Sequence, residues 1–111
     1  MGESLLDTNI LIELAKDRKF EIKGFITIFN VIEFPRTDLF INLVILYPEQ
    51  SEYFMSVFLA RELRKMGKPL PAIDILIASI CYNRKLSLIS KDKHFNAIKK
   101  IWKDFKITTK L

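Results

Sequence analysis

The sequence of 111 residues contains few of the residues that several common kinds of site require. A single cysteine, Cys81, excludes an internal disulfide and favours a reducing compartment. A single histidine, His94, leaves little for a histidine-based zinc site or a histidine-dependent nucleophile triad. The three glycines lie far apart, so a glycine-rich phosphate loop and nucleoside triphosphate chemistry are not expected.

Long apolar runs are missing as well. The longest stretches, such as residues 39–47 with Asn42 among them, fall well short of the roughly 20 residues that cross a bilayer. The first residues lack the basic side chains of a secretory signal, and Leu6 stands where a myristoylation motif needs Ser or Thr. These absences predict a cytoplasmic protein that makes no membrane contact.

The apolar segments predict a single α/β domain over residues 1–111. Hydrophobic residues make up 50% of the chain, which is enough for a core, and the low glycine and proline content argues against low-complexity sequence. The expected strands cover residues 4–6, 25–28, 86–90 and 105–108, and the expected helices cover residues 10–15, 31–34, 39–46, 49–66, 71–83 and 94–100. Alternating strands and helices imply a parallel sheet with helices on both faces.

Charge is distributed unevenly along the chain, whose formal net charge is +5. Residues 1–55 carry five Lys and Arg against nine Asp and Glu, whereas residues 56–111 carry thirteen against four. A basic surface of this kind suits a polyanionic partner such as nucleic acid. From charge alone, an ordinary solvated basic face is the better explanation.

Carboxylates set in apolar sequence give a more specific signal. Most of the thirteen acidic residues, Glu13 and Glu52 among them, lie among polar neighbours and are expected to be solvated. Four others stand beside apolar residues: Asp7, Glu33, Asp74 and Asp92. Burial of a charged carboxylate costs several kcal/mol unless the group is neutralised, paired or bound to a cation.

Each of these four residues has an ordinary explanation when it is taken alone: Asp7 as a helix cap, Asp74 at the positive end of a helix, Asp92 in a turn, and Glu33 paired with Arg36. Together they indicate more. The junctions that hold Asp7 and Asp92 fall at the same edge of a parallel sheet, outside the carboxyl ends of its strands. Asp74 can reach this edge from its helix, as can Glu33 with Asn30 one turn before it. Four carboxylates with no basic partner evident among them form an oxygen site that suits Mg²⁺ or Mn²⁺.

The motifs resemble the PIN-domain ribonucleases, particularly VapC-like toxins. The resemblance spans residues 4–95 and rests on Asp7-Thr8-Asn9, on Glu33 in a short helix, on residues 74–78 at the start of an apolar helix, and on residues 90–95 after a strand. It implies a three-layer α/β/α PIN-like fold with a four- or five-stranded parallel sheet. It also implies a homodimer and a small antitoxin protein as partners.

The same resemblance assigns roles to particular residues. It implies that Asp7, Glu33, Asp74 and Asp92 hold Mg²⁺ or Mn²⁺ and carry catalysis, while Asn9 and Ser90 orient these ligands. A divalent cation lowers the pKa of bound water and so supplies hydroxide to an RNA phosphodiester. Four basic residues flank the expected edge in sequence and are candidates to hold the RNA backbone, although an ordinary basic surface explains them equally well: Arg84, Lys85, Lys91 and Lys93.

Three functions follow from these observations. The leading one is a metal-dependent endoribonuclease that serves as the toxin of a type II toxin–antitoxin system. The second is a PIN nuclease that processes or matures RNA without an antitoxin. The third is a catalytically silent PIN-like module that binds protein or RNA, and the complete set of four carboxylates argues against it. Co-purification of a small neighbouring gene product would separate the first from the second.

Overall fold

A computed structural model describes residues 3–111 of the chain. Its strands are β1 (Ser4–Leu6), β2 (Glu21–Thr27), β3 (Ile41–Leu46), β4 (Ser87–Ile89) and β5 (Ile107–Thr108). Its α-helices are α1 (Thr8–Lys16), α2 (Ile28–Glu33), α3 (Gln50–Lys65) and α4 (Ala72–Asn83), and its 3-10 helices are η1 (Pro35–Leu39) and η2 (Lys93–Lys100). Within the described part of the chain, no helix has both the length and the apolar content of a membrane span.

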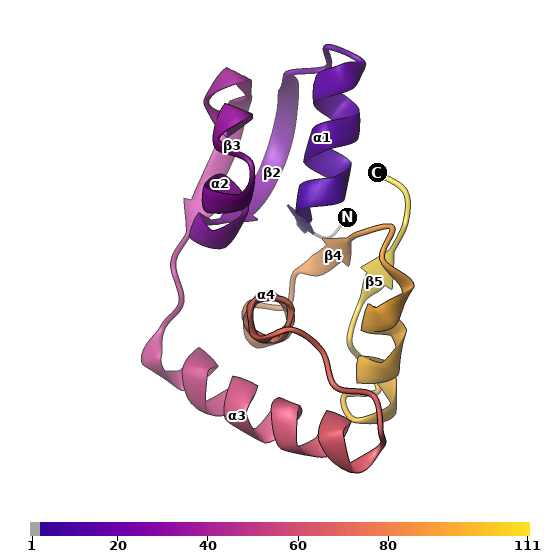
Figure 1. Cartoon of the computed structure of the whole chain (residues 1–111). Coiled ribbons are helices and arrows are strands. Elements are labelled where there is room, and N and C mark those ends of the chain that lie inside the picture. The colour runs from indigo at the N-terminus through magenta and orange to yellow at the C-terminus, as the bar shows by residue number, and fades with distance from the viewer. Residues whose placement is uncertain (1–2) are drawn as a thin grey trace.

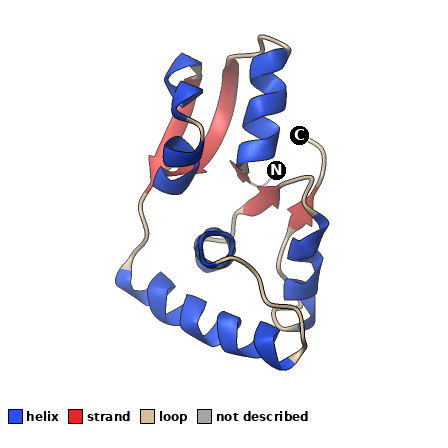
Figure 2. Cartoon of the chain, viewed as in Figure 1, coloured by secondary structure: helices blue, strands red, loops and turns tan. Residues whose placement is uncertain are grey.

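The strands form one parallel sheet in the order β3-β2-β1-β4-β5 (Figures 1 and 2). The two central strands are in register, with Leu5 opposite Leu88 and Leu6 opposite Ile89. Because side chains alternate along a strand, these pairs face opposite sides of the sheet. Leu5 and Leu88 pack beneath α4 with α3 outside it, whereas Leu6 and Ile89 pack against α1. The expected α/β fold with a covered parallel sheet is therefore confirmed.

One expected helix is wrong. Residues 39–46 form the end of η1 and the edge strand β3 instead. Strand β3 pairs with β2, and Val44 of β3 lies opposite Phe25 of β2. Asp38, just before this segment, lies inside η1. Ile41, Val44 and Ile45 of this segment are β-branched and favour a strand where a neighbouring strand offers its hydrogen-bonding edge, although the two leucines suit a helix equally well. The position of β2 thus decides the structure of this apolar run.

The long helix α3 begins and ends as the sequence predicts. Glu49 and Glu52 form a reciprocal capping box at its start. At its end Gly67 has a φ of 73°, the left-handed conformation that glycine adopts without strain. The N–H of Gly67 donates to the carbonyl of Arg64, and that of Lys68 to the carbonyl of Leu63. These two bonds form a Schellman motif, which turns the chain toward α4.

Glu52, expected to be solvated, is completely buried. Its Oε2 accepts hydrogen bonds from Nε of Arg84 at 2.8 Å and from the side chain of Asn83 at 3.0 Å. Its Oε1 accepts from the backbone N–H of Glu49 at 2.7 Å, and Arg84 also donates to the carbonyl of Tyr47. Desolvation raises the pKa of Glu52, but the hydrogen bonds from Arg84, Asn83 and Glu49 outweigh it and leave this pKa lowered. The ion pair joins α3 to the end of α4.

Candidate metal centre

The carboxyl ends of β1 and β4 bring Asp7 close to the segment that contains Ser90. Leu6 pairs with Ile89 in the sheet, and the N–H of Asp7 donates to the carbonyl of Ile89 at 3.0 Å. Asp7 then caps α1, since its Oδ1 accepts the N–H of Thr8 at 2.9 Å. The chain therefore leaves both central strands at one edge of the sheet, as the topology of a parallel sheet requires.

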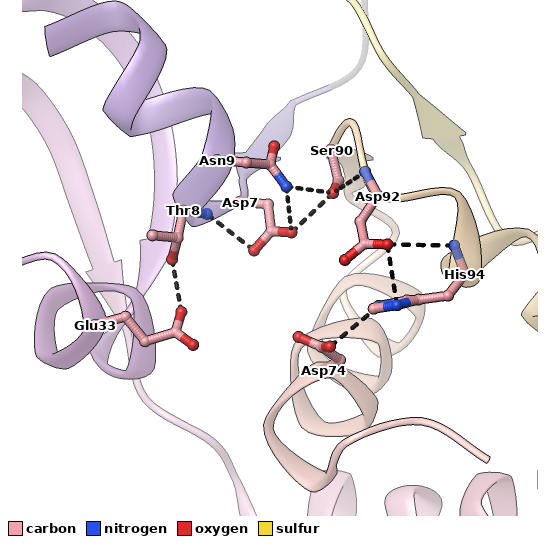
Figure 3. Close-up of polar contacts among 8 residues, drawn as sticks. All are labelled: Asp7, Thr8, Asn9, Glu33, Asp74, Ser90, Asp92 and His94. Carbon is pink, nitrogen blue, oxygen red and sulfur yellow. Dashed lines mark hydrogen bonds and ion pairs between the residues drawn. The ribbon is translucent and has the colours of Figure 1, made fainter. Parts of the chain in front are cut away.

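Two polar side chains position the carboxylate of Asp7, which is only 6% exposed (Figure 3). The hydroxyl of Ser90 donates to Oδ2 of Asp7 at 2.8 Å. The side-chain amide of Asn9 donates to the hydroxyl of Ser90 at 3.1 Å and, at a longer 3.4 Å, to the same Oδ2. Asn9 and Ser90 thus fix the orientation of the Asp7 carboxylate.

Burial raises the pKa of Asp7 above its ordinary value. Hydrogen bonds from Ser90 and Thr8 favour the charged form, while the negative charges of Glu33 and Asp92 oppose it. The raised pKa means that folding disfavours the ionised form of this carboxylate in the absence of a cation. A bound cation would reverse this cost.

Glu33, the last residue of α2, reaches the same edge through a chain of hydrogen bonds. The hydroxyl of Thr8 donates to Oε1 of Glu33 at 2.6 Å (Figure 3). The same hydroxyl accepts from the side-chain amide of Asn30 at 3.0 Å. Asn30 is completely buried, and its side-chain carbonyl accepts from the N–H and the hydroxyl of Thr27. The sequence places Asn30 one turn before Glu33, but it gives no sign of this link, because the link depends on Thr8 from another element.

The third part of the site joins Asp74, Asp92 and His94. Asp74 lies in the first turn of α4, and Asp92 and His94 follow β4. Nε2 of His94 lies 3.1 Å from Oδ2 of Asp74, and its Nδ1 lies 3.0 Å from Oδ1 of Asp92 (Figure 3). The expectation that the carboxylates have no basic partner is therefore wrong, because the only histidine stands between two of them. A lone histidine in the sequence gave no signal of this position.

The four predicted carboxylates approach one another to different degrees. One ligand atom each from Asp74, Asp92 and His94 lies within 4.8 Å of the others, and among residues 3–111 this is the only His, Cys, Asp and Glu group so close. Asp7 and Glu33 complete the surroundings from the β1 side (Figure 3). Burial raises the pKa of Asp74; the charge of His94 opposes the rise, and the negative charges of Asp7, Asp92 and Glu33 add to it.

The basic residues expected at this edge do not all lie there. The guanidinium of Arg84 is held by Glu52. Helix α4 begins beside the site and is about 18 Å long at 1.5 Å per residue, so Arg84 and Lys85 lie near the opposite end of the sheet. Lys91 forms an ion pair with Glu13. Arg84 and Lys85 flank the expected edge in sequence, but they lie away from the carboxylates because α4 starts beside the site and runs away from it. Their role in holding RNA stays a prediction.

The donor set fits a hard divalent cation. Carboxylate oxygens from four segments surround the site, together with the hydroxyls of Thr8 and Ser90. In the described part of the chain no Lys or Arg forms an ion pair with Asp7, Glu33, Asp74 or Asp92. Oxygen-rich sites of this kind suit Mg²⁺ or Mn²⁺.

Comparison with known proteins shows likeness in structure only. Neither a family model nor a curated protein matches the sequence. A chain of the toxin–antitoxin complex from Klebsiella pneumoniae has a TM-score of 0.68 and 22% identity, with 96% of this chain and 97% of that chain covered. A chain of VapBC2 from Rickettsia felis, bound to a DNA fragment from its promoter, has a TM-score of 0.72, 20% identity, and coverage of 95% and 96%. A chain of VapBC-1 from nontypeable Haemophilus influenzae has a TM-score of 0.73, 21% identity, and the same coverage. These likenesses confirm the resemblance to VapC-like PIN-domain proteins at the level of the fold.

Proposed function

We propose that this protein is a Mg²⁺- or Mn²⁺-dependent endoribonuclease that hydrolyses RNA phosphodiester bonds as the toxin of a toxin–antitoxin pair. One observation carries the proposal: carboxylates from four separate segments meet at one sheet edge, at a cost in charge repulsion and desolvation that a bound cation would remove. The pKa values of Asp7 and Asp74 are both raised there, first by burial and then by the negative charges of Glu33 and Asp92, which add to both shifts. A carboxylate cluster with a purely structural role has no reason to accumulate this strain.

Asp7, Glu33, Asp74 and Asp92 would hold the metal. When bound, the ion supplies a water of lowered pKa and offsets negative charge on the leaving oxygen. The protein's own contribution is to hold the ligands in position before the ion binds. Ser90 and Asn9 orient Asp7, and the buried Asn30 orients Glu33 through Thr8. His94 separates the carboxylates of Asp74 and Asp92.

The experiment for this proposal is an RNA cleavage assay with purified protein freed of bound inhibitor. Single-stranded or looped RNA should be cut with Mg²⁺ or Mn²⁺, and cleavage should stop in excess EDTA and return when Mn²⁺ is restored. Asp7→Asn should abolish cleavage, whereas Asp38→Asn, at an exposed acid of η1, should leave it unchanged. Cleavage that persists in EDTA would refute the metal mechanism.

The outer face of α3 supports a protein partner. Tyr53, Phe54, Val57 and Phe58 are all exposed, with Phe54 at 68% and Phe58 at 50%. A contiguous apolar patch of this kind marks a protein interface more often than free surface. We infer that the patch receives an apolar helix of a small antitoxin, from which an Arg or Lys side chain reaches the acidic edge, and that the toxin also forms a homodimer.

Co-expression with the product of the adjacent small gene tests this inference. The wild-type protein should co-purify with it, and light scattering of the toxin alone should give twice the monomer mass. Phe54→Ser with Phe58→Ser should lose the small partner, while Arg61→Ser with Arg64→Ser on the same helix should keep it. An active nuclease for which no partner is found would instead support a role in RNA processing.

A further inference from the structure

A cavity of about 370 Å³ lies beside the metal centre, between η2 and the segment that joins α3 to α4. Its walls include Lys68, Leu70, Lys93, His94, Asn96 and Lys100. The volume falls within the range of roughly 300–1,000 Å³ that is typical of small-ligand sites. We call this cavity the lysine pocket.

His94 forms a wall shared by the lysine pocket and the metal centre. The residue lines the pocket, while its two ring nitrogens lie 3.0 Å and 3.1 Å from carboxylate oxygens of Asp92 and Asp74. A chain molecule that reaches the carboxylates can therefore continue directly into the pocket. The two sites have opposite charge and are separated by one side chain.

No acidic side chain neutralises the lysines of the pocket. Among residues 3–111, the Lys and Arg residues in ion pairs with carboxylates are Lys65, Arg84 and Lys91, so Lys68, Lys93 and Lys100, like most basic residues of the chain, form none. No Asp or Glu lines the cavity. Three uncompensated ammonium groups around one cavity create a positive potential that favours an anion.

We propose that the lysine pocket holds a backbone phosphate of the RNA strand adjacent to the phosphodiester placed at the metal centre. This inference rests on the proposed function. The acidic centre repels a phosphate until a cation is bound, so a neighbouring phosphate held by Lys68, Lys93 and Lys100 keeps the strand at the site. Leu70 and the ring of His94 supply apolar surface for the attached ribose or base.

RNA suits this pocket better than an acidic protein segment does. Only the side chain of His94 separates the pocket from the centre where the phosphodiester must lie, and consecutive backbone phosphates supply one anion to each position. Lysine ammonium groups act as point charges that contact phosphate without reading sequence. The pocket therefore sets where the strand lies, and it does not select which base is cut.

The test compares two double variants with the same net charge. Lys68→Gln with Lys100→Gln removes two charges from the pocket, and Lys103→Gln with Lys106→Gln removes two exposed charges outside it. Binding of a short fluorescein-labelled single-stranded RNA is measured by anisotropy between about 50 and 200 mM salt, with Ca²⁺ in place of Mn²⁺. Thermal melts confirm that each variant folds, and Lys68→Arg with Lys100→Arg, which keeps both charges, should restore binding.

We expect the pocket variant to bind RNA about fivefold more weakly near 0.1 M salt, with a slope of log K against log salt flatter by about 0.7 for each lost phosphate contact. The outside variant should change both quantities much less. Equal losses in the two variants would overturn the proposal, because net charge alone would then explain them. Intact RNA binding together with a lost protein partner would also overturn it and assign the pocket to that partner.

Failure of the proposed function gives a different result. A parent protein that never cleaves RNA, or cleaves it in EDTA, contradicts the metal-dependent nuclease. The binding comparison needs no cleavage, so it still decides whether the lysine pocket holds RNA. Stabilisation by Mn²⁺ in a thermal melt should be the same for the parent and the pocket variant, because Lys68 and Lys100 do not contact the carboxylates.

Discussion

Nε2 of His94 lies 3.1 Å from Oδ2 of Asp74, a contact between the start of η2 and the first turn of α4. The imidazole gives the protein its own partner for a carboxylate that metal would otherwise satisfy. Its other nitrogen serves Asp92 in the same way. A side chain that follows β4 thus lies between the two carboxylates.

Removal of the His94 side chain tests whether it stabilises the metal-free site or binds the metal. His94→Ala should lower the melting temperature in EDTA, because Asp74 and Asp92 then face each other without a partner. Stabilisation by Mn²⁺ should persist or increase, since the carboxylates alone supply the oxygen ligands. Asn96→Ala, at an exposed position of η2, is the control and should melt as the parent does. Loss of the Mn²⁺ effect in His94→Ala would show that the imidazole is itself a ligand.

Neutralisation of Asp74 should not lower the melting temperature in EDTA, in contrast to His94→Ala. The pKa of Asp74 is raised by burial and by neighbouring carboxylates, so its contribution to stability is present below its unfolded pKa and is lost as pH rises through the folded value. Asp74→Asn should therefore melt at the same temperature as the parent or higher at neutral pH, and this advantage should shrink toward pH 4, roughly the unfolded pKa of aspartate.

The same variant should no longer gain stability from Mn²⁺. Asp38→Asn controls for the loss of one negative charge, because Asp38 is exposed and lies in η1, away from the four carboxylates. If Asp74→Asn melts clearly lower in EDTA and still responds to Mn²⁺, Asp74 is a structural residue and the metal site loses its main support.

Ser90 offers a test of ligand orientation. Ser90→Ala removes the hydroxyl that donates to Oδ2 of Asp7 at 2.8 Å, which leaves the buried carboxylate less well positioned. Removal of such an outer partner typically weakens metal binding by about 10- to 100-fold. Titration calorimetry with Mn²⁺ measures this loss, and Ser87→Ala, in β4 just before Ser90, is the control. An unchanged Mn²⁺ affinity in Ser90→Ala would show that this hydroxyl does not orient a metal ligand.

Arg84 should act on stability rather than on RNA. Arg84→Ala leaves Glu52 charged and buried without its partner. Removal of one partner of a fully buried ion pair costs about 3–5 kcal/mol, and the loss should be smaller here because the side chain of Arg84 is 24% exposed. Arg61→Ala, on the exposed face of α3, is the control. Urea unfolding measures both. A stable Arg84→Ala variant with weakened RNA binding would show that Arg84 contacts RNA.

The parent and the Arg84→Ala variant should also differ in their response to acid. The pKa of Glu52 is lowered in the fold, so its ion pair contributes stability above the unfolded pKa of glutamate and loses it as pH falls through the lowered folded value. Urea unfolding at a series of acidic pH values should show the parent losing its advantage over Arg84→Ala across this window. A constant difference between the two proteins would show that Glu52 is not the group responsible.

Local patterns in the sequence determine much of this protein. The apolar run before Asp7, the periodic apolar face and Gly67 of α3, and the apolar helix that begins near Asp74 each specify their own element, because hydrophobic spacing and capping act within a few residues. The carboxyl ends of parallel strands meet at one edge in any fold of this class, so Asp7 and Asp92 could be placed together before the structure was known.

Only the tertiary structure decides the remainder. The segment 41–46 is a strand because β2 offers it an edge to pair with, and no local signal contains that information. Likewise Glu52 is buried because Arg84 comes from another helix, and His94 meets Asp74 because α4 starts where β4 ends. The lysine pocket depends in the same way on the packing of Lys68 near Lys100. These contacts join residues that are distant in the chain. Periodicity and composition describe only local sequence, so they do not predict which distant residues become partners.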